Sequence, residues 1–262
     1  MAKVLPLFSG SKGNSYYISC SGSGILIDAG RSAKQLTLAL DANGVDPKTI
    51  EAIFVTHEHS DHVTGLRVFA NKYDIPVFTS QGTLAALTAK KYIDAKTRCF
   101  VMGSAGVDLS TMHVDRFPIS HDCAEGCGFR VDMGGKYYAH ATDLGVITEA
   151  VETALTGCDV VTIESNHDVN MLAMGPYPYE LKRRIMSDRG HLSNVVCSQF
   201  LPGLVKSGTK RFILAHLSQE NNMPEIAYRE SLNCLTDSDM LLDSDFTLDV
   251  APVDPSGKAI LF

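Results

Sequence analysis

The sequence predicts an α+β protein in which two mixed β-sheets pack face to face and helices cover their outer faces, an αββα sandwich. Short apolar segments bounded by Gly, Asn and Ser dominate both halves of the 262-residue chain, and helical segments follow them. Neither an internal repeat nor a long linker divides the sequence. We therefore expect one domain over residues 1–262.

The N-terminal part predicts a β-meander with strands over 4–8, 14–19 and 24–28, because turn-forming Gly and Ser residues separate these apolar segments. A helix is expected over 32–43, with Leu36 and Leu40 on one face and Gly44 just past its end. A buried strand over 52–55 follows. The opening segment contains Lys12 and Gly13 but lacks the spacing of a phosphate-binding P-loop, so it predicts a tight hairpin turn.

Strands and helices also alternate through the rest of the chain. Strands are expected over 98–102, 112–118, 159–164, 211–216, 246–251 and 259–262. A hairpin over 128–141 would turn at Gly134-Gly135. Helices are expected over 81–91, 147–155, 178–188 and 192–206 and after Pro224.

Composition narrows the possible functions. The chain is 45% hydrophobic and 20% charged, and its apolar runs are far shorter than the roughly 20 residues of a membrane helix. Seven cysteines without a secretory leader predict a reducing, cytoplasmic environment. The net charge of −7 argues against binding nucleic acid by bulk charge, although a bound metal and a few arginines can still set the field inside a cleft.

The strongest chemical signal lies directly after the strand expected over 52–55. His57, His59, Asp61 and His62 fall within six residues, where a loop can converge side chains that a regular element would separate. Imidazole and carboxylate together suit a divalent hydrolytic metal. A solvated polar loop is the alternative interpretation. We expect Thr56 to act structurally through its hydroxyl, and Glu58 and Ser60 to face solvent or support the ligands.

The segment His57-x-His59-x-Asp61-His62 resembles the metal-binding motif of the metallo-β-lactamase-fold hydrolases. The resemblance extends over nearly the whole chain and implies the αββα fold. It implies that Asp28 orients the histidine loop without binding metal. Three further motif positions follow expected strands in the family's order: His121, Asp143 and His216.

By this resemblance, two divalent metal ions, Mn²⁺ or Zn²⁺, would bind. His57, His59 and His121 would hold the first, Asp61, His62 and His216 the second, and Asp143 would bridge both. Two cations about 3.5–4 Å apart can share a hydroxide that attacks phosphorus or carbon. Asp61 or Asp143 is expected to orient this nucleophile.

Segments 7–15, 164–172, 190–194 and 216–222 resemble the YycJ (WalJ) subfamily of these proteins. This resemblance implies metal-dependent 5′-to-3′ exonuclease activity on double-stranded DNA, and DNA-repair proteins as partners. A phosphodiesterase acting on small or cyclic nucleotides is the first alternative. Acyl hydrolysis of a lactam or thioester, or a non-enzymatic metal-binding scaffold, also remains open. Oligomeric state is not predicted.

Two more features concern catalysis and binding. Glu164, at a strand end, and His191, expected to open a helix, resemble the acid–histidine pair of related phosphodiesterases, in which the histidine protonates the leaving oxygen. They could instead be structural. The basic residues Lys182, Arg183, Arg184 and Arg189 would contact phosphates, or form a solvated helix face, and Tyr177 and Tyr179 could stack on an end base.

The remaining histidines and cysteines give weaker signals. Cys123 and Cys127 flank the His121 loop, but without a second cysteine pair they are expected to be buried thiols. We expect His113 and His140 to be structural, and His167 to line the cleft.

Overall fold

The computed structural model describes residues 1–255 and 258–262 of the chain. Two seven-stranded sheets pack face to face, in the strand orders β14-β1-β2-β3-β4-β5-β6 and β13-β12-β11-β10-β9-β8-β7. The strands are β1 (Ala2–Phe8), β2 (Ser15–Cys20), β3 (Ser23–Ile27), β4 (Ile50–Phe54), β5 (Val77–Thr79), β6 (Cys99–Val101), β7 (Val107–Asp108), β8 (His113–Pro118), β9 (Cys127–Asp132), β10 (Tyr137–Ala141), β11 (Val160–Glu164), β12 (Arg211–Ala215), β13 (Thr247–Val250) and β14 (Ile260–Leu261). Both sheets are mixed, and β14 pairs antiparallel with β1.

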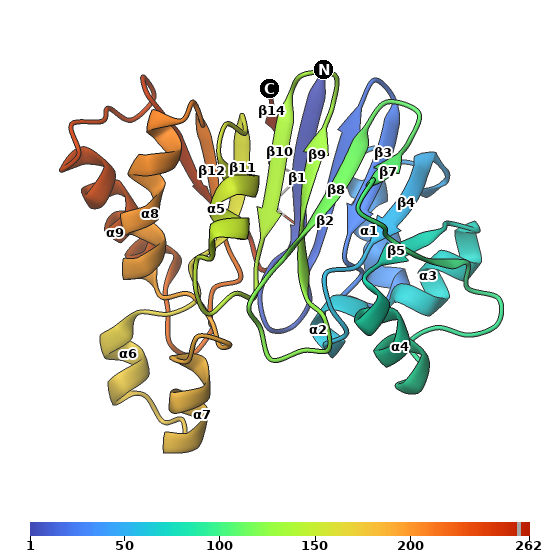
Figure 1. Cartoon of the computed structure of the whole chain (residues 1–262), viewed down its shortest axis with the longest axis horizontal. Helices are drawn as coiled ribbons and strands as arrows, with labels where there is room; N and C mark the ends of the chain where they lie inside the picture. The colour runs from blue at the N-terminus through green and yellow to red at the C-terminus, as the bar shows by residue number, and fades with distance from the viewer. Residues whose placement is uncertain (256–257) are drawn as a thin grey trace.

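Helices cover the outer face of each sheet, so the predicted αββα sandwich is confirmed (Figure 1). The helices are η1 (Pro47–Thr49, a 3₁₀ turn), α1 (Ala33–Ala42), α2 (Ser60–Val63), α3 (Leu66–Tyr73), α4 (Gln81–Ala89), α5 (Glu149–Leu155), α6 (Val169–Met174), α7 (Tyr179–Ile185), α8 (Asn194–Lys206) and α9 (Pro224–Thr236). Side chains of α1, α3 and α4 pack on the first sheet, and those of α5, α8 and α9 on the second. In Figure 1, α6 and α7 project from one lower corner.

Strand β3 shows why the sequence folds into stacked layers. Ile25 and Ile27 face the second sheet in the central core, whereas Leu26 between them packs with the helices on the outer face. Successive side chains of a strand point to opposite faces, and a strand covered on both faces is apolar at every position. The same alternation places Val4 in the central core and Leu5 against the helices.

The strands end in a way that gathers polar residues at one edge of the sandwich. β3, β4 and β5 run parallel, as do β10, β11, β12 and β13, so their carboxyl ends meet at the lower edge in Figure 1. Hairpin turns occupy the opposite edge, at Ser21-Gly22 between β2 and β3 and at Gly134-Gly135 between β9 and β10. The turn predicted at Gly134-Gly135 is therefore confirmed.

Six elements occur that the sequence did not predict: the 3₁₀ turn η1, helices α2, α3 and α6, and the short strands β5 and β7. Two expected helices begin or end elsewhere. The helix expected over 178–188 ends at Ile185, and the one expected from Leu192 begins at Asn194 with Ser193 as its N-cap. Among the described residues, no helix combines the length and apolar character needed to cross a membrane.

Candidate metal centre

Seven side chains from the carboxyl-terminal edge of both sheets converge at one place, and we call this set the metal centre: His57, His59, Asp61, His62, His121, Asp143 and His216. They follow β4, β8, β10 and β12 in the chain. The sheet topology thus brings together all the residues that the sequence motif predicted as ligands. Because they come from two sheets, the centre spans both sheets at this edge of the sandwich.

Three polar residues at these strand ends have left-handed backbone conformations: Asp28 (φ 61°), Asp143 (φ 59°) and His216 (φ 54°). Positive φ is uncommon outside glycine, with Asp, Asn and His enriched among the exceptions. Such conformations cost free energy and cluster at functional sites. Here each one turns the chain sharply after a strand so that the side chain points back towards the neighbouring strand ends.

His57, His59 and His121 form a three-histidine group. His57 Nε2 lies 3.0 Å from His59 Nδ1, which lies 3.3 Å from His121 Nε2. Two nitrogens bound to one zinc ion in a tetrahedron, each at about 2.0–2.1 Å, are about 3.3 Å apart. Burial and the nearby charge of His62 hold the pKa of His57 well below its usual value, which keeps its imidazole neutral, the form that binds metal. The group fits one divalent cation.

Asp61, His62 and His216 form a second, mixed group. Asp61 Oδ2 lies 3.4 Å from His62 Nε2 and 3.5 Å from His216 Nε2. His216 Nε2 is buried and makes no hydrogen bond to a described residue. Buried polar atoms normally have a partner, so an unpartnered imidazole nitrogen facing a carboxylate indicates a site for a cation.

Asp143 lies between the two groups. Its Oδ2 is 3.2 Å from His62 Nε2, and its Oδ1 is 3.8 Å from His121 Nε2. Oδ2 is buried and forms no hydrogen bond of normal geometry within the described part of the chain. Oδ1 also lies 3.4 Å from His216 Nδ1. The carboxylate therefore lies beside members of both groups, where a bridging ligand would lie.

The buried carboxylates of the centre favour positive charge among them. Burial would lower the pKa of His62, but Asp143, Asp28 and Asp61 outweigh burial and raise it well above its usual value. Burial also lowers the pKa of His216, but Asp143, Asp61 and Glu164 outweigh burial and raise this pKa to about 10. Buried carboxylates need compensating charge, which imidazole protons or a divalent cation can supply. Binding of a divalent cation would therefore release protons.

Asp28 holds the histidine loop in place. Its Oδ1 accepts a hydrogen bond from the Thr56 backbone N–H at 2.8 Å, and its Oδ2 accepts one from the Thr56 hydroxyl at 2.8 Å. The same Oδ2 lies 2.7 Å from His62 Nδ1, so it fixes that ring with Nε2 facing the centre. The expected roles of Thr56 and Asp28 match this geometry.

Asp28→Asn should weaken both the fold and metal binding, because an amide nitrogen would replace one of the accepting oxygens in a fully buried network. We expect the free energy of unfolding to fall by about 3 kcal/mol, and metal affinity to fall by about 10–100-fold. Urea denaturation and calorimetric metal titration measure the two effects. Asp254→Asn is the matched control, because Asp254 is exposed and, among the described residues, pairs with Arg31 alone. Unchanged metal affinity in Asp28→Asn would contradict the orienting role.

Glu164 and His191 lie together beside the mixed group. Glu164 Oε1 is 2.8 Å from both His191 Nδ1 and His216 Nδ1, and Oε2 accepts the backbone N–H groups of Leu144 and Leu192. Burial opposes the charged form of His191, but Glu164 outweighs it and raises the pKa of His191. The side chain of His191 is 18% exposed, so its ring can meet a substrate. His191 does not open a helix as predicted, because Gly190 and His191 form a loop before α8.

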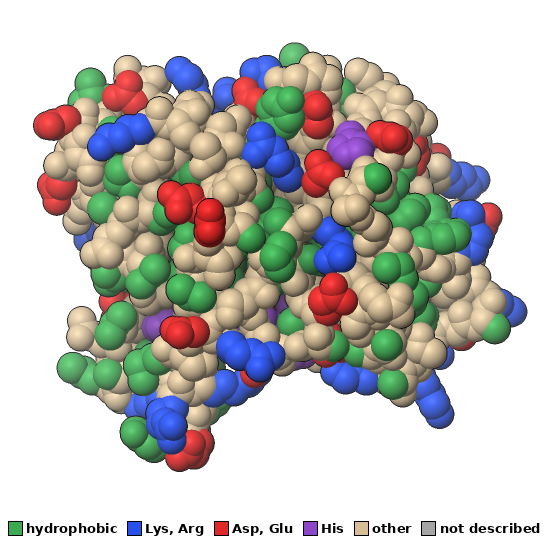
Figure 2. Space-filling view, in the orientation of Figure 1, with side chains coloured by type: hydrophobic (Ala, Val, Ile, Leu, Met, Phe, Trp, Pro, Cys, Tyr) green, Lys and Arg blue, Asp and Glu red, His purple; other side chains and the backbone are tan. Residues whose placement is uncertain are grey.

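The predicted basic cluster is largely engaged within the protein. Arg189 donates two hydrogen bonds to the backbone carbonyl of His121, at 3.1 and 3.2 Å. Arg184 pairs with Asp122, and Lys182 donates to the Ala173 carbonyl at 2.7 Å. The exposed side chain of Arg183 lies 3.5 Å from the exposed Glu180. Lys and Arg side chains also line the lower margin of the molecule around α7 (Figure 2).

Two residues at the centre were not singled out from the sequence. Asn14 Nδ2 lies 3.0 Å from His62 Nε2 and 3.2 Å from Asp61 Oδ2, while Gly10 N–H binds the Asn14 side-chain oxygen. Asp122 Oδ1 lies 3.4 Å from His121 Nε2 and is buried without a hydrogen bond to a described residue. Asn14 lies in segment 7–15, which carries part of the subfamily resemblance, and Asp122 directly follows the predicted ligand His121. These positions were the sequence signals that could have identified them.

The first turn of the chain also approaches the centre. It turns tightly, with Gly13 N–H bonded to the Gly10 carbonyl at 2.9 Å, as the sequence predicted. Gly30 packs so closely on the histidine loop that a Cβ there would lie 1.7 Å from the Asp61 carbonyl oxygen. A side chain at position 30 would therefore displace that loop.

The cysteines of the His121 loop lie outside both ligand groups. Burial raises the pKa of Cys123 to about 12, and it raises that of Cys127 further, so both are protonated thiols. The Cys127 thiol points to the Thr56 carbonyl at 3.6 Å. Cys127 is buried, as expected, whereas Cys123 is only partly buried, because it lies in the loop at the edge of the sandwich.

The three remaining histidines and Glu58 lie in different environments. His140 is buried beside Tyr138, and burial lowers its pKa to about 3. His113 pairs at the surface with Asp108 at 2.6 Å. His167 is buried, with Nδ1 unpartnered among described residues, and burial lowers its pKa to about 4. Glu58 is buried and accepts the Ala124 backbone N–H at 3.1 Å, so it supports the His121 loop and does not face solvent.

Known proteins resemble this chain in sequence and in fold. A family model described as a beta-lactamase superfamily domain matches residues 24–217. The exodeoxyribonuclease WalJ of Streptococcus pneumoniae is 35% identical over 251 residues, covering 94% of this chain and 93% of that protein. The exodeoxyribonuclease YycJ of Bacillus anthracis is 36% identical over 229 residues, 84% of each. The metallo-β-lactamase-fold protein YhfI of Bacillus subtilis has a TM-score of 0.73 at 13% identity, covering 99% and 98% of the two chains.

Proposed function

The chain belongs to the metallo-β-lactamase superfamily, in its YycJ-like subfamily, and on that basis we propose that it is a metal-dependent exonuclease that degrades double-stranded DNA from 5′ ends. The single observation that carries the proposal is the convergence of two donor groups around Asp143 beside the Glu164–His191 pair. Sequence identity to two exodeoxyribonucleases over most of the chain supports DNA as the substrate.

We assign the ligands from the same geometry. His57, His59 and His121 would hold one divalent cation, while Asp61, His62 and His216 would hold a second, with Asp143 shared between them. Nitrogen and carboxylate donors without thiolate suit Mn²⁺ or Zn²⁺. When bound, the two cations would supply a nucleophile from water at neutral pH and neutralise charge on the phosphoryl oxygens.

The protein's own groups would complete the reaction. Asp61 or Asp143 orients the attacking water, because both carboxylates face the space between the donor groups. Glu164 accepts the Nδ1 proton of His191 and so directs Nε2 towards substrate. Protonated His191 can then donate its Nε2 proton to the departing 3′-oxygen.

The Glu164–His191 pair also favours phosphodiester cleavage over acyl hydrolysis. A DNA 3′-oxygen is a poor leaving group and benefits from a proton donor. Acyl transfer at a dinuclear centre has less need of a separate acid. The pair is held by four hydrogen-bond contacts to Glu164, so the acid is fixed in place before substrate binds.

The binding surface for duplex phosphates would lie along α7 and the loop that follows it. Phosphate contacts position DNA without reading its sequence, which suits a nuclease of broad specificity. Arg184 and Arg189 reach the His121 loop, so DNA bound along α7 would lie next to the metal centre. The cytoplasmic location expected from the cysteines and the DNA-repair partners expected from the resemblance stay predictions.

Removal of metal should abolish degradation of duplex DNA, and added Mn²⁺ or Zn²⁺ should restore it. We would measure release of nucleotides from duplexes labelled at the 5′ end and from matched duplexes whose 5′ ends are blocked. A cation that binds only the folded state also raises the melting temperature. Intact DNA in the presence of a metal-loaded, stabilised protein would reject the exonuclease and leave a phosphodiesterase acting on small nucleotides as the better proposal.

A further inference from the structure

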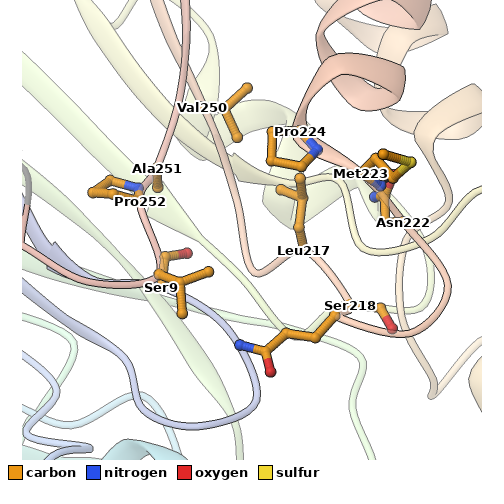
Figure 3. Close-up of a pocket in the computed structure, with 11 residues that line it drawn as sticks. Ser9, Leu217, Ser218, Asn222, Met223, Pro224, Val250, Ala251 and Pro252 are labelled. Carbon is orange, nitrogen blue, oxygen red and sulfur yellow. Dashed lines mark hydrogen bonds between the residues drawn. The ribbon is translucent and has the colours of Figure 1, made fainter.

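A pocket of about 460 Å³ opens at the same edge of the sandwich as the metal centre. Loops that follow β1, β12 and β13 line it. In Figure 3, Leu217 and Pro224 form one side, Ala251 and Pro252 form the other, and Ser9 lies beside Pro252. Small-molecule sites are commonly about 300–1,000 Å³, so the pocket is large enough for one small ligand.

The pocket shares a wall with the metal centre. Ser9 Oγ accepts the backbone N–H of His216 at 2.8 Å and the Tyr16 hydroxyl at 2.9 Å. Leu217 and Ser218 directly follow His216 and continue into the pocket lining. A group that occupies the pocket would therefore lie next to a substrate held at the mixed donor group.

The chemistry of the lining excludes an anion and favours a neutral ring. No charged side chain lines the pocket among residues 1–255 and 258–262. Leu217, Val250 and Pro252 offer apolar surface, while the exposed amide of Gln219 makes no hydrogen bond to another described residue. A phosphate in such a pocket would lose its hydration without a cationic partner. A heterocycle would gain apolar contact and could bond to the amide.

We propose that this pocket binds the nucleobase of the 5′-terminal nucleotide, next to the scissile phosphate. The inference rests on the proposed exonuclease function and adds a subsite to it. A terminal base leaves its stack at a modest cost, and enzymes that act on nucleotides recover that cost by enclosing the base. An amide that can both donate and accept accommodates all four bases, so the pocket would favour a base over none.

The test compares duplexes that carry a normal or an abasic nucleotide at the 5′ end. Base contacts of this kind change affinity by about tenfold, so the wild type should show a KM about tenfold higher for the abasic end. Val250→Phe fills the pocket and should bring the ratio of the two KM values near one. Gln219→Ala, at an exposed position, should reduce the ratio partly without endangering the fold. Val68→Phe, on the exposed side of α3, is the matched control.

The possible results distinguish failure of the base-binding proposal from failure of the exonuclease proposal. Equal KM values for both ends in the wild type, or an unchanged ratio in both pocket variants, would overturn the proposal while leaving the exonuclease intact. If the metal-loaded wild type does not degrade DNA, the exonuclease proposal fails, and the pocket is then judged by calorimetry with dAMP. Binding that Val250→Phe weakens about tenfold supports the pocket, whereas absent or equal binding overturns it.

Discussion

Asp143→Asn is expected to lower turnover on duplex DNA by about 10³-fold or more while the protein remains folded. Asp143 is the one carboxylate whose two oxygens face both donor groups. Removing its charge from between two cations forfeits transition-state stabilisation on the order of 4 kcal/mol. Asparagine tolerates the left-handed backbone found at φ 59°, so this substitution changes the chemistry without straining the chain.

Steady-state nucleotide release, metal content and circular dichroism together measure this result. Asp108→Asn is the matched control, because Asp108 is an exposed β-strand residue whose one ion pair within the described part of the chain is with His113. We expect that variant to match the wild type. Normal turnover by a folded Asp143→Asn protein, verified to have lost its metal, would eliminate the dinuclear mechanism.

His191→Ala should lower turnover on DNA by about 10²–10⁴-fold, the usual contribution of a positioned proton donor. The effect should depend on the leaving group. A p-nitrophenolate departs without protonation, so a chromogenic p-nitrophenyl ester of thymidine 5′-phosphate should be cleaved by the variant almost as fast as by the wild type. A merely structural role for His191 would slow both substrates equally.

Glu164→Gln tests the proton-donor role of His191 by changing the carboxylate that contacts its ring. Glutamine carries no charge to hold a proton on His191, and its NH2 group cannot accept the Leu144 and Leu192 backbone N–H groups as Oε2 does. We therefore expect turnover on DNA to fall while cleavage of the chromogenic ester falls less. His113→Ala serves as the control histidine, since its ring lies at the surface in contact with Asp108 and Asp115. Equal losses on both substrates in His191→Ala and Glu164→Gln would assign the pair to structure.

Much of the fold could be predicted because its strands are buried on both faces. Segments such as 24–28 and 211–216 are largely apolar and end at a polar residue, and both strands form within one or two residues of the expected bounds. α1 was equally clear, because Ser32 and Gln35 form a capping box at its start. Strong local signals and tertiary packing agree in these elements.

The missed elements are shorter, and the one side-chain cap of α6, from Asp168, does not by itself predict a helix of that length. β5 and β7 contain three and two residues and exist because a neighbouring strand offers hydrogen bonds to them. α3 begins at Gly65 without a side-chain cap, and α6 spans only six residues. Elements this short are stabilised by tertiary contacts, which the local sequence does not reveal.

The ligand positions could be predicted from motif and strand order, but their supporting contacts could not. Arg189 holds the His121 carbonyl across 68 positions of sequence, and Arg184 reaches Asp122 across 62. Only folding of α7 against the His121 loop brings these residues together. The basic side chains stand out in the sequence, but their contacts within the protein could not be predicted from it.

The hairpin turn at Gly134-Gly135 is a suitable place to attach a fluorescent label. It lies at the edge opposite the metal centre, and a Cβ built on either glycine would meet nothing within 4 Å. A short dye-labelling peptide inserted there would project away from bound DNA. Single-molecule imaging could then follow individual enzymes along a stretched duplex and record the length degraded in each encounter.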